Sequence, residues 1–433
     1  MTIVHAFLAL LLLACYILKA PSAHGLKLSE AFEAAKKNTL TIQTHIIDEK
    51  LSELNKAEIN TAIRPTLSLS ASQLWRDPIT NSSSTSVASS STNAFNSLGS
   101  RQHSVAFSAS QPLFQGGSEY HLLQAAQFYP QISKSNRVQT ELDLYAQLAR
   151  VFYEILALEE QTRTLREQVD LLEQRITYLR LRVKIGRSRK TDLLMAESQQ
   201  ARLQSELQAL KANMLEVSDQ LTQLTGLSAW ESIEDPLKEG WESKFLIGQE
   251  SQDSEKPKDH AQLKAEKLRR EQMRTELRAV KGSFWPQVDL TGNYYFDRTG
   301  SLRDSEWDIT LGARWELYSG GRTKIEEGQR FLALEKQELK VVDLERNQRS
   351  LVKRLRALLR AKIDEVKKLR IAVQLARKSY EENIRDSKTG LLSDLELLRS
   401  LDDYLQIKRS FDQVQFQPKI IYFEFVNAKG DFP

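Results

Sequence analysis

Two carboxylates occupy equivalent places in the sequence. Asp192 lies six residues after Gly186, Glu396 lies six residues after Gly390, and each acid is followed by two leucines. An acid just after a chain reversal stabilises the helix that begins there, because a helix N-terminus carries partial positive charge. At a narrow opening, the same carboxylate also attracts cations. Arg399 lies three residues beyond Glu396 and can pair with it on one helix face, so Asp192, Glu396 and Arg399 are the candidate charged residues beside the two reversals.

Other residue types that support catalysis or metal binding form no pattern in this sequence. The six histidines are scattered without partners at ligand spacing, and the single cysteine, Cys15, excludes an internal disulfide. Ser-His-Asp order and a Walker-type loop are both absent from the sequence. The pairs Gly116-Gly117 and Gly320-Gly321 precede helices and could hold phosphate, but their position between strand and helix favours a sharp turn. We therefore expect neither enzyme activity nor a cofactor.

Three glycines recur at a constant offset of 204 residues. Gly117, Gly186 and Gly226 correspond to Gly321, Gly390 and Gly430. Between them, apolar residues step by three and four, which is the seam of a coiled coil. A lone glycine between two seams marks a reversal. The sequence thus predicts two copies of a helical hairpin, with tips at Gly186 and Gly390, and a helix of 69 residues would be about 100 Å long.

Alternation of apolar and polar residues predicts four strands, two before each hairpin. They lie near 67–75, 104–110, 287–296 and 307–316. An antiparallel sheet packed on a core is one reading, but the helices use their apolar seams on each other and leave no core for it. A membrane barrel with apolar residues facing lipid is favoured. Four strands cannot close a barrel and an open edge cannot lie in lipid, so several chains must share one barrel.

The repeats divide the chain into segments with distinct roles. Residues 1–25 are predicted to be an export signal, because their apolar run is short and is followed by small residues. A lipoprotein box ending at Cys15 remains an alternative. Residues 26–226 form the first repeat, 227–258 an equatorial linker and 259–433 the second repeat; each repeat has a helix, two strands and a hairpin. The helix of the first repeat is expected from Leu28 to about Ile63. The Ser-rich segment 77–100 is expected to be a long loop outside the cell.

The charge balance excludes one class of partner. Lys and Arg number 61 and Asp and Glu number 57, for a net charge of +4. A nucleic-acid binder carries a strongly basic face, so we expect no nucleic acid. Membrane lipid is the expected environment of the four strands.

Two glycine-anchored motifs resemble those of the TolC family of bacterial outer-membrane efflux proteins. They are Gly186-x-Ser188-x-x-x-Asp192-Leu193-Leu194-x-Ala196 running to Leu224-Thr225-Gly226, and Gly390 with Glu396-Leu397-Leu398 running to Gly430. The resemblance covers nearly all of the chain after the signal. It implies a mixed α and β membrane protein, with coiled-coil hairpins forming an α-barrel and four transmembrane strands per chain in a shared, trimeric, 12-stranded β-barrel.

The resemblance also implies a function, a location and partners. The homotrimer would lie in the outer membrane of a Gram-negative bacterium, with a helical tunnel in the periplasm. It would be the passive channel of a tripartite efflux pump or type I secretion system, working with a periplasmic adaptor and an inner-membrane transporter. The acids at Asp192 and Glu396 would lie near the periplasmic entrance. The best-known members have an acid where this chain has Arg399, which leaves the ion selectivity of the entrance open.

A second interpretation is a periplasmic coiled-coil adaptor or structural protein without a pore. Adaptors of the membrane-fusion type have one hairpin and separate β-domains. Two hairpins and no such domains argue against this alternative.

Overall fold

The computed structural model describes residues 25–75, 101–227, 230, 232–237, 240–242, 260–298, 305–389 and 391–431. The expected export signal, the Ser-rich segment 77–100 and Gly390 lie outside these residues, apart from Gly25. The chain forms two compact units, which are described separately. Unit 1 comprises Met1–Ile46, Arg137–Ala261 and Glu345–Pro433, and unit 2 comprises Ile47–Asn136 and Gln262–Leu344.

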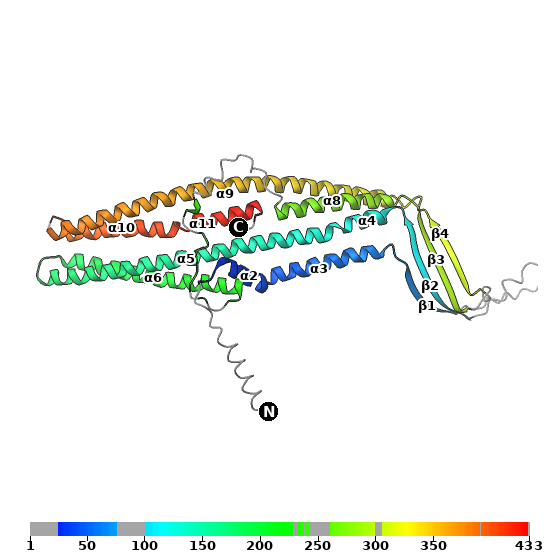
Figure 1. Cartoon of the computed structure of the whole chain (residues 1–433), viewed down its shortest axis with the longest axis horizontal. Helices are drawn as coiled ribbons and strands as arrows, with labels where there is room; N and C mark the ends of the chain where they lie inside the picture. Colours follow the sequence, from blue (N-terminus) through cyan, green and yellow to red (C-terminus); the bar gives the residue numbers. More distant parts are fainter. Residues whose placement is uncertain are drawn as a thin grey trace, which may run out of the picture. The chain divides into compact units, whose positions relative to one another are not determined.

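Unit 2 contains one antiparallel sheet in the order β1-β2-β3-β4 (Figure 1). The strands are β1 (Thr66–Trp75), β2 (Arg101–Gln115), β3 (Gln287–Arg298) and β4 (Trp307–Arg314). All four strands expected from the alternation are present. The central pair β2–β3 joins the two repeats, whereas β1 and β4 each have one neighbour in the described sheet.

The two faces of the sheet differ in chemistry. Leu69, Phe107, Tyr294 and Trp307 form one row across the four strands, and their exposed fractions are 69%, 40%, 46% and 62%. The adjacent row faces the opposite side because side chains alternate along a strand. In that row Ser108 Oγ donates to Asn293 Oδ1 at 2.7 Å, and Asn293 Nδ2 donates to Asp308 Oδ1 at 2.8 Å. The apolar face is therefore exposed, and the polar face is hydrogen-bonded across the strands.

Four helices precede or follow the strands in the chain. Two glycines, Gly116 and Gly282, lie close together where β2 ends. The helices are α3 (Leu40–Thr61), α4 (Ser118–Ala126), α8 (Ala261–Gly282) and α9 (Arg322–Thr389), of which α3 and α9 continue into unit 1. Gly116 and Gly117 turn the chain into α4 with φ of 68° and 77°. A Cβ on Gly116 would lie 1.9 Å from the Gly282 carbonyl oxygen, whereas one on Gly117 would meet nothing within 4 Å. Gly320 and Gly321 repeat the positive φ, at 68° and 85°, before α9.

Unit 1 contains the two hairpins. Helix α5 (Phe128–Lys184), which begins in unit 2, pairs with α6 (Lys190–Thr225), and α9 pairs with α10 (Asp394–Val414) (Figure 1). Helix α9 has 68 residues, as the 69-residue glycine spacing predicted. Apolar seam residues Leu165, Leu172 and Leu203 are buried together, so the coiled-coil seams are real packing surfaces.

Three predicted helices are broken in the structure. The helix expected between Gly117 and Gly186 is divided at Gln127 into α4 and α5. The helix expected from Leu28 to about Ile63 is divided at Thr39 into α2 (Leu28–Asn38) and α3. The break is stabilised because Asn38 Nδ2 donates to the Gln223 carbonyl at 2.8 Å, which satisfies the end of α6. The returning helix of the second hairpin ends at Val414, and α11 (Gln417–Lys429) follows. Pro418 lies in the first turn of α11, where its missing N–H is tolerated.

The inter-repeat linker is anchored to unit 1 where it is described. Ile233 forms a parallel bridge with Leu26. Tyr153 donates its hydroxyl to Asp235 at 2.9 Å, and Lys419 forms an ion pair with the same carboxylate. Burial, followed by the Asp235 charge, raises the pKa of Tyr153, which therefore remains a donor. The segment thus ties α5 to α11.

None of the helices in the described part of the chain is both long and apolar enough to cross a membrane.

Replacing Gly116 by alanine should destabilise the protein much more than replacing Gly117. Both changes place a side chain in the left-handed region, which costs about 1–2 kcal/mol. Only Gly116→Ala also drives a methyl group into the Gly282 carbonyl, which adds roughly 1–3 kcal/mol of overpacking. Urea unfolding followed by tryptophan fluorescence measures both losses. Equal losses for the two variants would contradict this close contact.

Candidate functional site

The first hairpin reverses between Lys184 and Lys190. Gly186 has a φ of 74°, and the Arg187 N–H donates to the Arg182 carbonyl at 2.8 Å, which closes the end of α5. This is the left-handed glycine termination common at helix ends. Asp192 follows in the first turn of α6, half-buried. Its position therefore suits both predicted roles, the stabilising of a helix N-terminus and a charge beside the tip.

The second hairpin places Glu396 in a capping box. The Glu396 N–H donates to Ser393 Oγ at 3.3 Å, and the Ser393 N–H donates to Glu396 Oε2 at 3.0 Å. The Ser393 hydroxyl also donates to the same carboxylate oxygen, at 2.7 Å. The sequence Ser393-Asp394-Leu395-Glu396 carries the signature of this box, so the role of Ser393 could have been predicted from the sequence.

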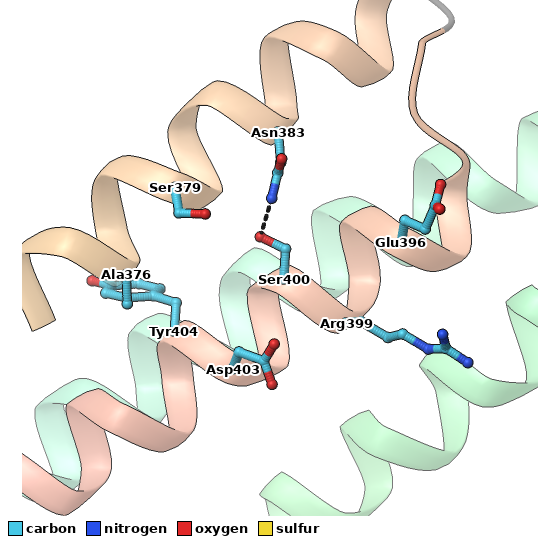
Figure 2. A pocket seen from close by; sticks show the side chains of 8 residues that line it. All are labelled: Ala376, Ser379, Asn383, Glu396, Arg399, Ser400, Asp403 and Tyr404. Carbon is cyan, nitrogen blue, oxygen red and sulfur yellow. Dashed lines mark hydrogen bonds between the residues drawn. The ribbon is translucent and has the colours of Figure 1, made fainter. Parts of the chain in front are cut away.

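These bonds keep the Glu396 carboxylate ionised. The hydrogen bonds from the Ser393 hydroxyl and N–H lower the pKa of Glu396, and the charge of Arg399 contributes less. Figure 2 shows the Arg399 side chain directed away from Glu396. The expected pairing of Glu396 with Arg399 is therefore not the main interaction at this tip, because Ser393 holds the carboxylate instead.

A groove runs along the second hairpin beside this capping box. It lies between α9 and α10, has a volume of about 380 Å³, and includes Glu396, Arg399 and Asp403 (Figure 2). Asn383 Nδ2 donates to Ser400 Oγ across it at 2.7 Å. The groove is open, and most of the residues that line it are polar. Among the described residues no cluster of His, Cys, Asp or Glu could hold a metal ion.

Polar pairs connect the two hairpins near their tips. Gln199 Nε2 donates to Asp402 Oδ1 at 2.7 Å, and Arg202 lies 3.6 Å from the same carboxylate. Further from the tips, Arg409 pairs with Glu206 at 2.9 Å. Leu398 joins the buried seam of the first hairpin. These contacts hold the tips of one chain together, and the sequence contained no signal that pairs residues about 200 positions apart.

A buried polar layer interrupts the apolar seam between α5 and α10. Thr164, Gln168 and Asp412 are each 1% exposed. Burial raises the pKa of Asp412 to about 6. The charges of Lys408 and Arg163 oppose this rise in pKa, and the charge of Glu160 adds to it. A charge in this layer is unfavourable because it loses hydration. The layer is thus sensitive to protonation between mildly acidic and neutral pH.

Asp412→Asn should remove a pH dependence from the stability of the second hairpin. Between the ordinary pKa of 3.8 and about 6, the folded protein binds more protons than the unfolded protein. Stability therefore falls as the pH rises through this window and stays low above it. We expect the variant to gain about 3 kcal/mol at pH 7.5. Hydrogen exchange of α10 amides from pH 4.5 to 7.5 tests this, and an unchanged slope in the variant would refute it.

Comparison with known proteins agrees with this architecture. The family described as outer membrane efflux protein matches residues 64–227. The outer membrane efflux protein BepC of Brucella suis biovar 1 (strain 1330) is 20% identical over 427 residues, covering 98% of this chain and 89% of BepC.

Solved structures of outer-membrane channels have the same fold. CusC superposes with a TM-score of 0.78 at 12% identity, covering 94% of this chain and 92% of CusC. VceC of Vibrio cholerae gives 0.77 at 15% identity, covering 93% and 96%. These likenesses confirm the expected fold class, an α-barrel of hairpins combined with a β-barrel. The resemblance to TolC-like outer-membrane efflux proteins is likewise confirmed.

Proposed function

We propose that this chain, a TolC-like efflux channel of the outer membrane, acts as a passive homotrimeric conduit in a tripartite pump or type I secretion system. The observation that carries the proposal is the sheet, whose apolar face is exposed and whose polar face is bonded across strands. An apolar exterior and a polar interior are what a barrel wall in lipid requires. The family and fold are those of channel proteins, and we assign no enzyme activity.

The number of chains follows from the open edges of the sheet. Strands β1 and β4 each leave backbone N–H and C=O groups without a strand partner in the described sheet. Such groups are costly in lipid and must be paired. A closed ring of identical chains pairs β4 of one chain with β1 of the next. Three chains supply twelve strands, which is the closure that the TolC resemblance implies.

The same proposal assigns the segments and the partners. After an export signal at 1–25, residues 26–226 and 259–433 would each supply two barrel strands and one hairpin of the periplasmic tunnel. Residues 227–258 would form the equatorial band between them. A periplasmic adaptor would join the hairpin tips to an inner-membrane transporter, which supplies the energy. The alternative adaptor role leaves the exposed apolar face of the sheet unexplained.

A disulfide between chains tests the trimer and its register together. Within the chain, Ala109 of β2 pairs with Gly292 of β3. The second strands of the two repeats are offset by 204 residues, which relates Ala109 to Ala313. The first strands are offset by 221 residues, as Pro65 and Pro286 are, which relates Gly292 to Ala71. We therefore expect Ala71→Cys/Ala313→Cys to form, on oxidation, a covalent species of three chains on a denaturing gel.

The control moves one cysteine to the other face of the same strand. Ser70→Cys with Ala313→Cys should give little crosslinking, because neighbouring residues point to opposite sides of a sheet. A protein that stays monomeric in detergent and forms no crosslink with either pair would rule out the shared barrel.

We further propose that Asp192 and Glu396 set the ion preference of the periplasmic entrance. Gly186 and Gly390 would form the hairpin tips, and a trimer would bring about six carboxylates to one mouth. Arg399 would add three cations where other members carry acids. The low pKa of Glu396 supports this role, because its carboxylate stays charged across the physiological range.

Neutralising Asp192 and Glu396 should change the ion selectivity of the channel without dissociating the trimer. In planar bilayers under a salt gradient, Asp192→Ala/Glu396→Ala should lower the preference for cations on the order of threefold, because fixed charge concentrates counter-ions. Ser393→Ala is the matched control: it weakens the cap by about 1 kcal/mol but keeps the carboxylate. If Ser393→Ala shifts the reversal potential as much as the double variant, capping alone explains Glu396.

A further inference from the structure

Three buried polar side chains lie in the seam between α5 and α10, and two of them have unsatisfied hydrogen-bonding atoms. We call Thr164, Gln168 and Asp412, each of which is 1% exposed, the polar layer. Among the described residues, Asp412 Oδ2 and both polar side-chain atoms of Gln168 are buried without a hydrogen-bond partner. Such groups are costly to bury unless a partner is found for them. The polar layer therefore has a capacity to bind that the packed helices do not use.

The helix that carries Asp412 is interrupted one turn beyond it. Helix α10 ends at Val414 and α11 begins at Gln417. Pro418 has no N–H to donate to the Val414 carbonyl, so the helical hydrogen-bond ladder is incomplete at this point. Helices bend at such breaks. The break thus separates α10, which leads to the hairpin tip, from α11.

The first hairpin shows that the fold requires neither the buried acid nor the break. The offset of 204 residues relates Asp412 to Gln208, which is exposed, and Pro418 to Met214. Helix α6 runs through both positions without interruption. The reversal and packing of a hairpin therefore do not explain why the second hairpin places an acid in a buried seam beside a helix break.

The surroundings of Asp412 leave it free to change its charge near neutral pH. Burial raises the pKa of Asp412 to about 6, although the Thr164 hydroxyl and Lys408 lower it. Among the described residues, no cation forms an ion pair with this carboxylate. Other charged groups on the neighbouring helices are paired with one another or exposed: Lys408 with Glu167 at 3.1 Å, Arg163 with Glu160 at 2.5 Å, Arg409 with Glu206 at 2.9 Å, Lys419 with Asp235, and the exposed Lys368 and Arg370.

The two protonation states of Asp412 make different demands on the helices. A neutral carboxyl can donate to Gln168 Oε1 and accept from Gln168 Nε2, which satisfies both side chains inside the seam. An ionised carboxylate only accepts, so Gln168 Oε1 lacks a donor and the charge lacks hydration. Water meets both needs, because it donates and accepts. At 1% exposure, water reaches these atoms only if α5 and α10 move apart.

We propose that the polar layer is a proton-operated latch between the two hairpins. The neutral Asp412 carboxyl bonds to Gln168 and holds α10 on α5, and its ionisation admits water and lets α10 bend away at the break after Val414. The continuous helix α9 follows by gentle curvature, which long helices allow. The latch consists of contacts within one chain, so it goes beyond the proposed function and does not depend on it.

The size of the effect follows from the two protonation equilibria. Asp412 has an ordinary pKa of 3.8 and a pKa of about 6 in the packed layer. Protonation therefore favours the latched form on the order of 100-fold. A factor of this size takes a two-state equilibrium from about ten to one to about one to ten. The latch should hold below the pKa of about 6 and loosen above it.

Distances between spin labels on the two helices test the latch directly. Gln174→Cys on α5 and Asp403→Cys on α10 are exposed sites for the labels, and labelled chains are diluted with unlabelled ones so that each distance lies within one chain. Double electron–electron resonance on the full-length protein in detergent should give one narrow distance at pH 5. At pH 7.5 a longer, broader component should appear, with a midpoint near pH 6. The same distribution at both pH values overturns the proposal.

Three variants separate the latch from a general effect of pH. Asp412→Asn cannot ionise and pairs with Gln168 through its amide, so the narrow distance should persist at pH 7.5. Gln168→Met removes the partner of the neutral carboxyl and should show the longer component already at pH 5. Asp170→Asn removes an exposed acid of α5 and is the matched control, which should behave as the wild type does. A distance that still depends on pH in Asp412→Asn, or one that is narrow at pH 5 in Gln168→Met, contradicts the latch. If Asp412→Asn does not fold, Gln168→Met decides.

Channel recordings test what the latch controls in the proposed conduit. In planar bilayers the wild type should open severalfold less often at pH 5 than at pH 7.5, and Asp412→Asn should lose this difference. Glu396 stays ionised in this range, because its pKa lies below the usual 4.5. A protein whose label distances change with pH but which conducts at neither pH would keep the latch and refute the proposed channel function.

Discussion

The sheet depends on one constraint: a backbone polar group in lipid must be hydrogen-bonded by protein. Four strands leave two edges unpaired in the described sheet, so the fold of one chain is complete only in an oligomer. The exposed row of Leu69, Phe107, Tyr294 and Trp307 has the same meaning, because an apolar surface this continuous is stable in lipid and not in water. The duplication of the chain gives each protomer four strands rather than two.

Comparing the two repeats separates what the fold requires from what it allows. Both repeats keep left-handed glycines after their second strand, and both return a side-chain hydrogen bond to the end of the preceding helix: Gln111 to Ile63 at 2.7 Å, and Trp315 to Phe284 at 3.0 Å. These features belong to the joint between strand and helix. The charge at the hairpin tip differs between the repeats, although the chain reverses at both tips. The reversal therefore does not require this charge, which can serve the recognition of a partner.

Periodicity made the strands and hairpins predictable, because their residues contact neighbours at fixed spacing along the chain. The four strands, the 68-residue α9 and the positive φ of Gly186 follow from local pattern. The break at Thr39 was not predictable in this way, because the stabilising partner of Asn38 is the end of α6, far away in sequence. The pairing of Gln199 with Asp402 and the burial of Asp412 are likewise consequences of how the hairpins pack.

The candidate entrance shows how one carboxylate can serve both stability and selectivity. Ser393 supplies the hydrogen bonds that keep Glu396 ionised. The helix cap therefore favours the charged form of Glu396 and does not neutralise it. Arg399 does not neutralise this acid, since its side chain is directed away (Figure 2). In the proposed entrance, the two charges would therefore act separately on an ion. A mouth with both signs of charge would discriminate less than one lined only by acids, which suits the proposed conduit, whose cargo would be chosen by its transporter.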